Sequence, residues 1–232
     1  MKWKKMAAAV LLLIVLAAVL FVTDYYHAGD TAKKALESDA VQVEKTSYGW
    51  FFDGPADDAV FVFYPGAKVE ETAYAPLLHS LAKNGIDVCL VKMPLHFAVL
   101  GMNAADSVFE QYNAEKRYIG GHSLGGAVAA NYAAEHELDG VILLAAYPTK
   151  EVEEPMLMIY GSEDGVLNMD QVAAAAQYGT VKEVVIDGGN HAGFGDYGDQ
   201  VGDHTAAITA GEQQQTALNA ITEWLAEQKT DA

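Results

Sequence analysis

The sequence is poor in cysteine and in basic residues. Cys89 is the one cysteine among 232 residues, so the chain forms no internal disulfide and has no cysteine cluster that would bind zinc. There are 14 Lys and Arg against 32 Asp and Glu. Lys2, Lys4 and Lys5 precede every acidic residue, which leaves 11 basic residues after position 23. Because so acidic a surface repels nucleic acid and anionic membranes, we expect no nucleic-acid partner.

Charged residues are also missing from Met6 to Thr23. A helix of this length spans roughly 27 Å, close to the hydrocarbon thickness of a bilayer. A cleaved signal peptide, which would make the domain a secreted one, is the alternative. That alternative requires small residues before the cleavage site, whereas Tyr26-His27-Ala28 has a tyrosine at the first of those positions.

We therefore predict three regions along the chain. Residues 1–23 are expected to be a membrane anchor that contacts the lipid bilayer through residues 6–23, and residues 24–40 a juxtamembrane stalk. The lysines before the apolar run predict a cytoplasmic N-terminus. The third region, a domain over residues 41–232, then lies on the extracytoplasmic side of the cell membrane in a single-pass topology.

Short β-rich runs alternate with helical patterns beyond Val41. Runs at 41–45 and 48–54 predict an opening hairpin. Further strands are predicted at 59–66, 87–94, 116–123, 140–148, 156–164 and 181–189, and helices at 71–85, 104–112, 124–137, 169–178 and 212–228. This alternation indicates an α/β fold with a doubly wound, mostly parallel sheet. Only seven residues, 149–155, separate two of the strands, which leaves no room for a cap domain.

Ser123 lies in the stretch GHSLG, which fits the pattern G-x-S-x-G at a predicted strand-to-helix junction. The pattern is typical of a nucleophile elbow, in which side chains at Gly121 and Gly125 would collide with the neighbouring strand and helix. The alternative is that Ser123 is only a small residue in a tight turn.

A nucleophilic serine needs a base and a carboxylate that orients the base, in the chain order serine, acid, histidine. Asp164 follows the predicted strand at 156–164, and His191 follows the next one. Glu163 is the alternative acid. We expect His122, inside the elbow, to pack or hydrogen-bond beside the site rather than act as the base.

Three motifs together, GGHSLGG, YGSEDGVLN and GGNHAGFGDYG, resemble those of the α/β-hydrolase superfamily over about residues 59–228. The chain is most similar to its small, lidless, dienelactone-hydrolase-like members, including membrane-anchored bacterial ones. The resemblance implies that Ser123 is the nucleophile, Asp164 the orienting acid and His191 the general base. Dienelactone hydrolase itself uses a cysteine nucleophile, so the serine here argues against that particular substrate.

The resemblance also implies an oxyanion hole built from backbone amides. The family's usual His-Gly after the third strand is replaced here by Tyr64-Pro65-Gly66-Ala67, which keeps the glycine. Ala67 and Leu124 are therefore expected to supply the N–H groups.

Loops at the carboxyl edge of the sheet are expected to wall a shallow pocket. The candidate wall residues are His96, Phe97, Tyr147, Phe194 and Tyr197. Asp196, Asp199 and Asp203 share a glycine-rich loop, but their spacing does not match a calcium-binding loop. We predict no metal and no other cofactor.

The sequence thus predicts a serine hydrolase that cleaves a small carboxylic ester or thioester through an acyl-enzyme. Two alternatives stay open: an acyltransferase that uses an alcohol in place of water, and a catalytically silent extracytoplasmic binding module.

Overall fold

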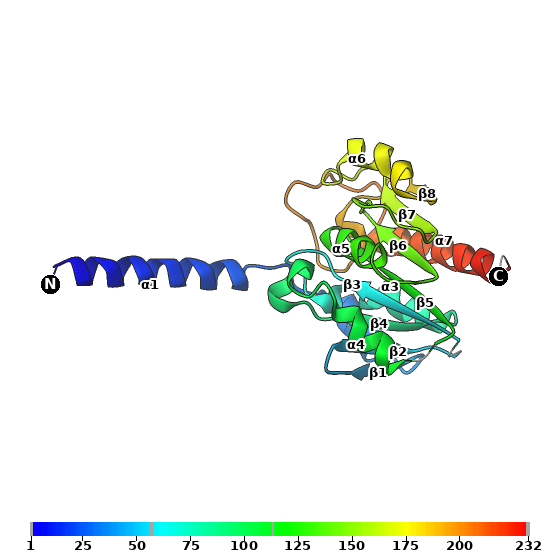
Figure 1. Ribbon diagram of the computed structural model, residues 1–232, viewed down its shortest axis with the longest axis horizontal. Helices are drawn as coiled ribbons and strands as arrows, with labels where there is room; N and C mark the ends of the chain where they lie inside the picture. Colours follow the sequence, from blue (N-terminus) through cyan, green and yellow to red (C-terminus); the bar gives the residue numbers. More distant parts are fainter. Residues whose placement is uncertain (1, 56–57, 113, 231–232) are drawn as a thin grey trace.

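The computed structural model describes residues 2–55, 58–112 and 114–230. Within this part of the chain, eight strands form one sheet in the order β1-β2-β4-β3-β5-β6-β7-β8 (Figure 1). The strands are β1 (Gln42–Lys45), β2 (Gly49–Asp53), β3 (Ala59–Tyr64), β4 (Asp87–Val91), β5 (Lys116–His122), β6 (Gly140–Leu144), β7 (Met156–Gly161) and β8 (Val181–Ile186). Strands β3 to β8 run parallel, and β1 and β2 form the predicted antiparallel hairpin at one edge. The predicted doubly wound, mostly parallel sheet is confirmed.

Helices cover both faces of this sheet (Figure 1). The α-helices are α1 (Lys2–Thr23), α2 (Asp30–Leu36), α3 (Ala75–Lys83), α4 (Ala104–Gln111), α5 (Leu124–Ala133), α6 (Met169–Ala174) and α7 (Ala210–Thr230). Short 3-10 helices are η1 (Glu71–Tyr74), η2 (Pro94–His96), η3 (Ala98–Leu100), η4 (Ala175–Tyr178) and η5 (Ala192–Phe194). Helices α2, α3 and α7 pack on one face, and α4, α5 and α6 on the other.

The central strands are apolar on both sides because both faces are covered. In β3 every residue is buried, and alternate side chains enter different layers of the core. Phe61 and Phe63 pack in the layer of α3 and α7, whereas Val60 and Val62 pack in the layer of α4 and α5. The connection from β6 to β7, residues 145–155, contains no helix, so the expected lack of a cap domain is also confirmed.

Residues 24–40 differ from the stalk expected for them. Helix α2 packs against α3, and its residue Ala32 is fully buried in the core. The backbone N–H of Ala32 donates to Oδ2 of Asp196 at 2.7 Å, and the N–H of Gly29 donates to the Asp196 carbonyl oxygen at 2.7 Å. These contacts fix the segment to the domain, because the Asp196 carboxylate satisfies an N–H at the start of α2 that the helix cannot pair internally.

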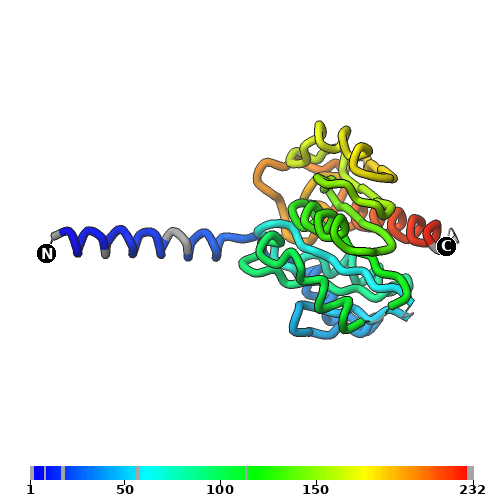
Figure 2. Tube along the Cα trace, viewed as in Figure 1, coloured from blue at the N-terminus to red at the C-terminus, as the bar shows by residue number. Residues whose placement is uncertain are grey.

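Helix α1 projects from the domain, and the two termini lie at opposite ends of the molecule (Figure 2). Its segment Trp3–Thr23 is long and apolar enough to cross a membrane, and no described residue of its most apolar stretch is buried. Membrane anchors and signal sequences share this property.

Candidate active site

Ser123 occupies a tight turn between β5 and α5. Its backbone has φ 53° and ψ −125°, a positive-φ conformation that residues other than glycine rarely adopt. The Ser123 N–H donates to the carbonyl oxygen of Leu144 at 2.9 Å, which fastens the turn to β6. Helix α5 begins at Leu124, so the positive end of its dipole lies next to the serine. Backbone strain of this kind is concentrated at functional sites.

The glycines on either side of the serine are required by close backbone contacts. A Cβ atom at Gly121 would overlap the carbonyl oxygen of Tyr64, and one at Gly125 would overlap the carbonyl oxygens of Tyr64 and Pro65. The end of β3 therefore lies directly against the serine turn. This agrees with the steric reason predicted from the sequence pattern.

His191 and Asp164 form a buried pair on the loops that follow β8 and β7. Nδ1 of His191 lies 2.9 Å from Oδ2 and 3.1 Å from Oδ1 of Asp164, and both side chains are 1% exposed. Oδ1 also accepts the N–H groups of Val166 and Leu167, at 2.9 and 2.8 Å. Since an ionised carboxylate only accepts, the Nδ1 of His191 carries the proton and Nε2 is left as an acceptor.

Ser123 and His191 line the same cavity, which has a volume of about 220 Å³. Nε2 of His191 is buried and has no hydrogen-bond partner among the described residues. The neighbouring Glu163 accepts a hydrogen bond from Ser162 at 3.4 Å, whereas Asp164 is the acid that hydrogen-bonds the imidazole. The structure therefore brings together the half-buried Ser123, the buried imidazole of His191, whose Nε2 is free to accept a hydrogen bond, and Asp164.

His122 is part of a hydrogen-bonded chain behind the serine turn. Its Nε2 lies 3.0 Å from the carbonyl oxygen of His191, so this nitrogen is the donor. Its Nδ1 then accepts from the Tyr74 hydroxyl at 2.8 Å, and the Tyr74 oxygen accepts the N–H of Gly66 at 3.1 Å. Burial, and next the nearby His191, hold the pKa of His122 well below its usual value. His122 is thus a neutral connector, as expected, between the loop after β3 and the loop after β8.

Asp203 joins the loops that carry the acid and the histidine. Its Oδ2 accepts the N–H of Ala192 at 2.9 Å, and its Oδ1 accepts the N–H of Gly165 at 3.0 Å and of His204 at 2.9 Å. From the sequence, the loop that carries this aspartate was expected to be an ordered rim of the site rather than a metal-binding loop. The glycine-rich loop around it gave no signal for its role between the two loops.

The predicted oxyanion-hole residues lie on two sides of the turn. Leu124 is the first residue of α5 and lines the cavity. Ala67 comes directly after Gly66, whose N–H is fixed by Tyr74. Both lie next to the end of β3 that the elbow glycines contact.

The predicted wall residues occupy different positions. Tyr147 lines the cavity, as does a group that the sequence did not single out, Val166, Leu167 and Asn168. Phe194 is fully buried, and its ring lies 5.8 Å from that of His122. Tyr197 is also buried and packs against Tyr26 and Tyr74. Phe194 and Tyr197 are therefore core residues behind the site, which corrects their placement in the wall.

His96 and Phe97 contact the N-terminal segment instead of the cavity. The His96 ring stacks on Tyr25 with centroids 4.0 Å apart, and Phe97 stacks on Phe21 at 5.8 Å. This is a second correction to the predicted wall. The partners could not be foreseen because residues 21–25 were taken as anchor and stalk.

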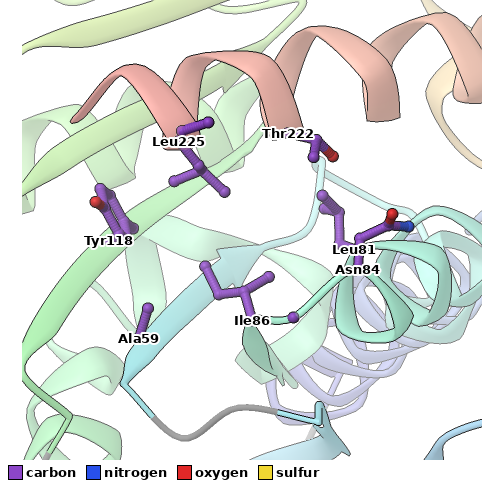
Figure 3. A pocket seen from close by; sticks show the side chains of 9 residues that line it. Ala59, Leu81, Asn84, Ile86, Tyr118, Thr222 and Leu225 are labelled. Carbon is purple, nitrogen blue, oxygen red and sulfur yellow. The ribbon is translucent and has the colours of Figure 1, made fainter. Parts of the chain in front are cut away.

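A second cavity, of about 150 Å³, lies at the opposite, amino edge of the sheet (Figure 3). Ala59 and Tyr118 enter it from β3 and β5, and Leu81 and Leu225 from helices α3 and α7. Among the described residues that line it there is no Ser, Cys, His, Asp or Glu. Cys89 is buried in the core, as expected, and burial raises its pKa to about 12. The Ser123 cavity, by contrast, combines a serine in a strained turn with the imidazole of His191.

A family model described as the alpha/beta hydrolase family matches residues 60–216. No curated protein matches the chain at the sequence level. Several solved structures are similar in fold. A dienelactone hydrolase from Anabaena variabilis has a TM-score of 0.61 and 14% identity, covering 81% of this chain and 98% of its own.

Two further solved structures are comparable. A monoacylglycerol lipase from Paleococcus ferrophilus has a TM-score of 0.59 and 16% identity, covering 81% of this chain and 99% of its own. An esterase from Pyrococcus furiosus has a TM-score of 0.55 and 15% identity, and the match covers 71% of this chain and 87% of the esterase. At these identities the likeness establishes the fold.

Proposed function

The chain belongs to the alpha/beta hydrolase family, and on that premise we propose that it is a serine hydrolase that cleaves a small carboxylic ester or thioester. The observation that carries the proposal is the buried Asp164–His191 pair, at 2.9 Å, whose Nε2 is unpartnered among the described residues beside the cavity that Ser123 lines. The names of the three solved relatives, a dienelactone hydrolase, a monoacylglycerol lipase and an esterase, support ester substrates.

The first half of the reaction transfers the acyl group to Ser123. His191 Nε2 takes the hydroxyl proton as Oγ attacks the carbonyl carbon, and Asp164 holds the tautomer and stabilises the imidazolium. The N–H groups of Ala67 and Leu124 stabilise the oxyanion. The carbon–oxygen or carbon–sulfur bond then breaks, and the imidazolium returns its proton to the leaving alcohol or thiol.

Water completes the cycle. It gives a proton to His191 Nε2 and attacks the acyl carbon, the bond to Oγ breaks, and Ser123 regains its proton as the carboxylic acid leaves. The side chains of Ser123, His191 and Asp164 carry out the proton transfers and the covalent chemistry in both halves of the reaction. The cavity of about 220 Å³, whose lining includes Ala127, Ala145 and Ala146 beside Tyr147, holds a small acyl group or the carbonyl end of a longer chain that protrudes from it.

Hydrolysis of a short ester tests the proposal. We expect Ser123→Ala, His191→Gln and Asp164→Asn each to lower kcat by about 10³-fold or more. Glu163→Gln is the matched control, since it neutralises the adjacent carboxylate, whose described hydrogen bond is with Ser162. Activity retained in Ser123→Ala would refute the proposal. Loss in Glu163→Gln with retention in Asp164→Asn would move the role of acid to Glu163.

Product analysis separates the two alternative functions. If an added alcohol captures the acyl group in preference to water, the protein is an acyltransferase. If a folded protein processes no ester at all, the binding module is favoured.

We further propose that residues 1–23 anchor the chain in the cell membrane, with the domain on the extracytoplasmic side. The support is the apolar length of Trp3–Thr23 and the lysines that precede it. The domain boundary at residue 41 is moved by this proposal to about residue 24, because α2 packs on α3. Full-length protein that is released from membranes by alkaline carbonate would contradict the anchor.

A further inference from the structure

Large apolar side chains are exposed on one loop that follows β4. Leu95, Val99, Leu100 and Met102 are 52%, 48%, 55% and 42% exposed. Among the described residues beyond α1, only four other large apolar side chains are comparably exposed, and three of those also follow carboxyl ends of strands: Val166, Met169 and Val201. An apolar cluster of this kind on an otherwise acidic protein indicates an interaction surface.

The backbone of this loop is held in a strained conformation. Leu95 and His96 have φ of 52° and 59°, which is costly for side chains of this size. The carbonyl oxygen of His96 accepts the N–H of Lys68 at 2.8 Å, and that of Met102 accepts the Tyr64 hydroxyl at 2.8 Å. The loop is therefore fixed to the end of β3 with Leu95 presented to solvent, and strain of this kind is retained where it serves a function.

The same loop contacts the end of α1. Phe97 stacks on Phe21, the last aromatic residue of the apolar helix, and His96 stacks on Tyr25. The ammonium group of Lys68 lies 5.0 Å from the centre of the Phe21 ring and 2.6 Å from Oδ2 of Asp24. The exposed loop thus begins where the apolar helix ends.

Tyr26 ties two more loops of the sheet's carboxyl edge to this point. It forms a parallel bridge with Val69, and its hydroxyl accepts the N–H of Val201 at 3.0 Å. Val201 is 89% exposed. Helix α1 accordingly leaves the domain from the edge where the strands end (Figures 1 and 2). The Ser123 cavity lies at this same edge, because the residues that line it come after the carboxyl ends of β5, β6, β7 and β8 in the sequence.

We infer that the apolar rim, defined as Leu95, Val99, Leu100, Met102 and Val201, rests in the headgroup layer of the bilayer that α1 crosses, and that the Ser123 cavity receives amphiphilic esters from that layer. The inference rests on the proposed hydrolase function and membrane anchor. Tyr25 and Tyr26 lie between the apolar helix and the domain, where aromatic residues favour a membrane interface. The acidic domain selects uncharged or zwitterionic esters, because it repels anionic ones.

Depth measurement tests the docking without reference to activity. Full-length Leu100→Cys and Asn84→Cys proteins are labelled with an environment-sensitive fluorophore and reconstituted in phosphatidylcholine vesicles. Cys89 does not interfere, because it is buried. Asn84 is exposed at the amino edge (Figure 3). Nitroxide lipids should quench about half of the signal at position 100 and little at position 84. Equal quenching at both positions would overturn the docking.

Kinetics test the route of the substrate. We expect the double variant L95N/V99Q to hydrolyse a long-chain methylumbelliferyl ester in phosphatidylcholine vesicles about tenfold more slowly than the wild type, with methylumbelliferyl acetate unaffected. Asparagine tolerates positive φ, so the loop keeps its conformation. Val185→Gln, which removes an equally exposed apolar side chain on β8, is the matched control and should leave both rates unchanged.

The outcomes separate the two proposals. Suppose that all three proteins hydrolyse the acetate, and that L95N/V99Q, Val185→Gln and the wild type hydrolyse the long-chain ester in vesicles at equal rates. This result would overturn the membrane route and leave the hydrolase function intact. A wild-type protein that hydrolyses neither ester would refute the hydrolase function and the substrate class with it. The quenching contrast would still decide whether the rim docks.

Discussion

Replacing Tyr74 with phenylalanine removes one oxygen that two buried groups share. Without the hydroxyl, Nδ1 of His122 loses its donor at 2.8 Å and the N–H of Gly66 loses its acceptor at 3.1 Å. Each buried polar group left without a partner costs about 1–3 kcal/mol. We therefore expect Tyr74→Phe to lower the free energy of unfolding by about 2–4 kcal/mol, which corresponds to roughly 5–15 °C in Tm for a domain of this size.

Tyr118→Phe is the matched control for this measurement. Tyr118 is also buried, but its hydroxyl has no hydrogen-bond partner among the described residues. Its removal should change the free energy of unfolding by less than about 1 kcal/mol. Urea denaturation of both variants decides the point, and equal losses of stability in the two would show that the Tyr74 hydroxyl does not support the chain of hydrogen bonds. A lower kcat in Tyr74→Phe alone is also expected, because Gly66 precedes the amide of Ala67.

Three further predictions concern neighbouring parts of the site. His122 stays neutral in the folded protein, whereas the same histidine in the unfolded chain takes up a proton as the pH drops below about 6.5. The free energy of unfolding should therefore decrease in that range, by up to about 1.4 kcal/mol per pH unit. Urea titrations of the wild type and His122→Gln check this, and identical dependence on pH in the two proteins would contradict it. Asp203→Ala removes the carboxylate that accepts three backbone N–H groups, so it should lower the free energy of unfolding by about 2–3 kcal/mol and reduce kcat. Asp199→Ala on the same loop should lower the free energy of unfolding by less than about 0.5 kcal/mol, as measured by thermal unfolding. Gly125→Ala should lower the free energy of unfolding by more than about 3 kcal/mol or prevent folding, because its Cβ would overlap two carbonyl oxygens. Gly211→Ala in α7, where a Cβ has open space, should leave the stability unchanged or raise it. A larger loss of stability in Gly211→Ala than in Gly125→Ala would refute the packing argument.

The elements of the sheet could be predicted because their signals are local. The run AVFVFYPG is apolar on both faces and became β3, which is buried on both faces. The elbow could be predicted for a similar reason: Gly121 and Gly125 are spaced by the geometry of one turn. The helix expected over 71–85 begins instead as 3-10 helix η1 before α3, where Pro76 lies in the first turn.

The rest depends on contacts between distant parts of the chain. Residues 24–40 were expected to be a stalk because nothing local reveals that Asp196 binds the start of α2. Phe194 was expected in the wall because it follows His191 closely, but η5 turns its side chain into the core. Val166 and Leu167 were not predicted as cavity residues, because their position depends on the hydrogen bonds from their N–H groups to the Asp164 carboxylate.

The central claim is that Ser123 is activated by His191. Intact-mass analysis of the full-length protein after treatment with a fluorophosphonate probe tests it directly, with Ser123→Ala and His191→Ala as variants whose folding is checked by circular dichroism. We predict stoichiometric labelling of the wild type, none in Ser123→Ala and a strong loss in His191→Ala. A folded wild-type protein that takes up no probe, or labelling that persists in Ser123→Ala, would contradict the account.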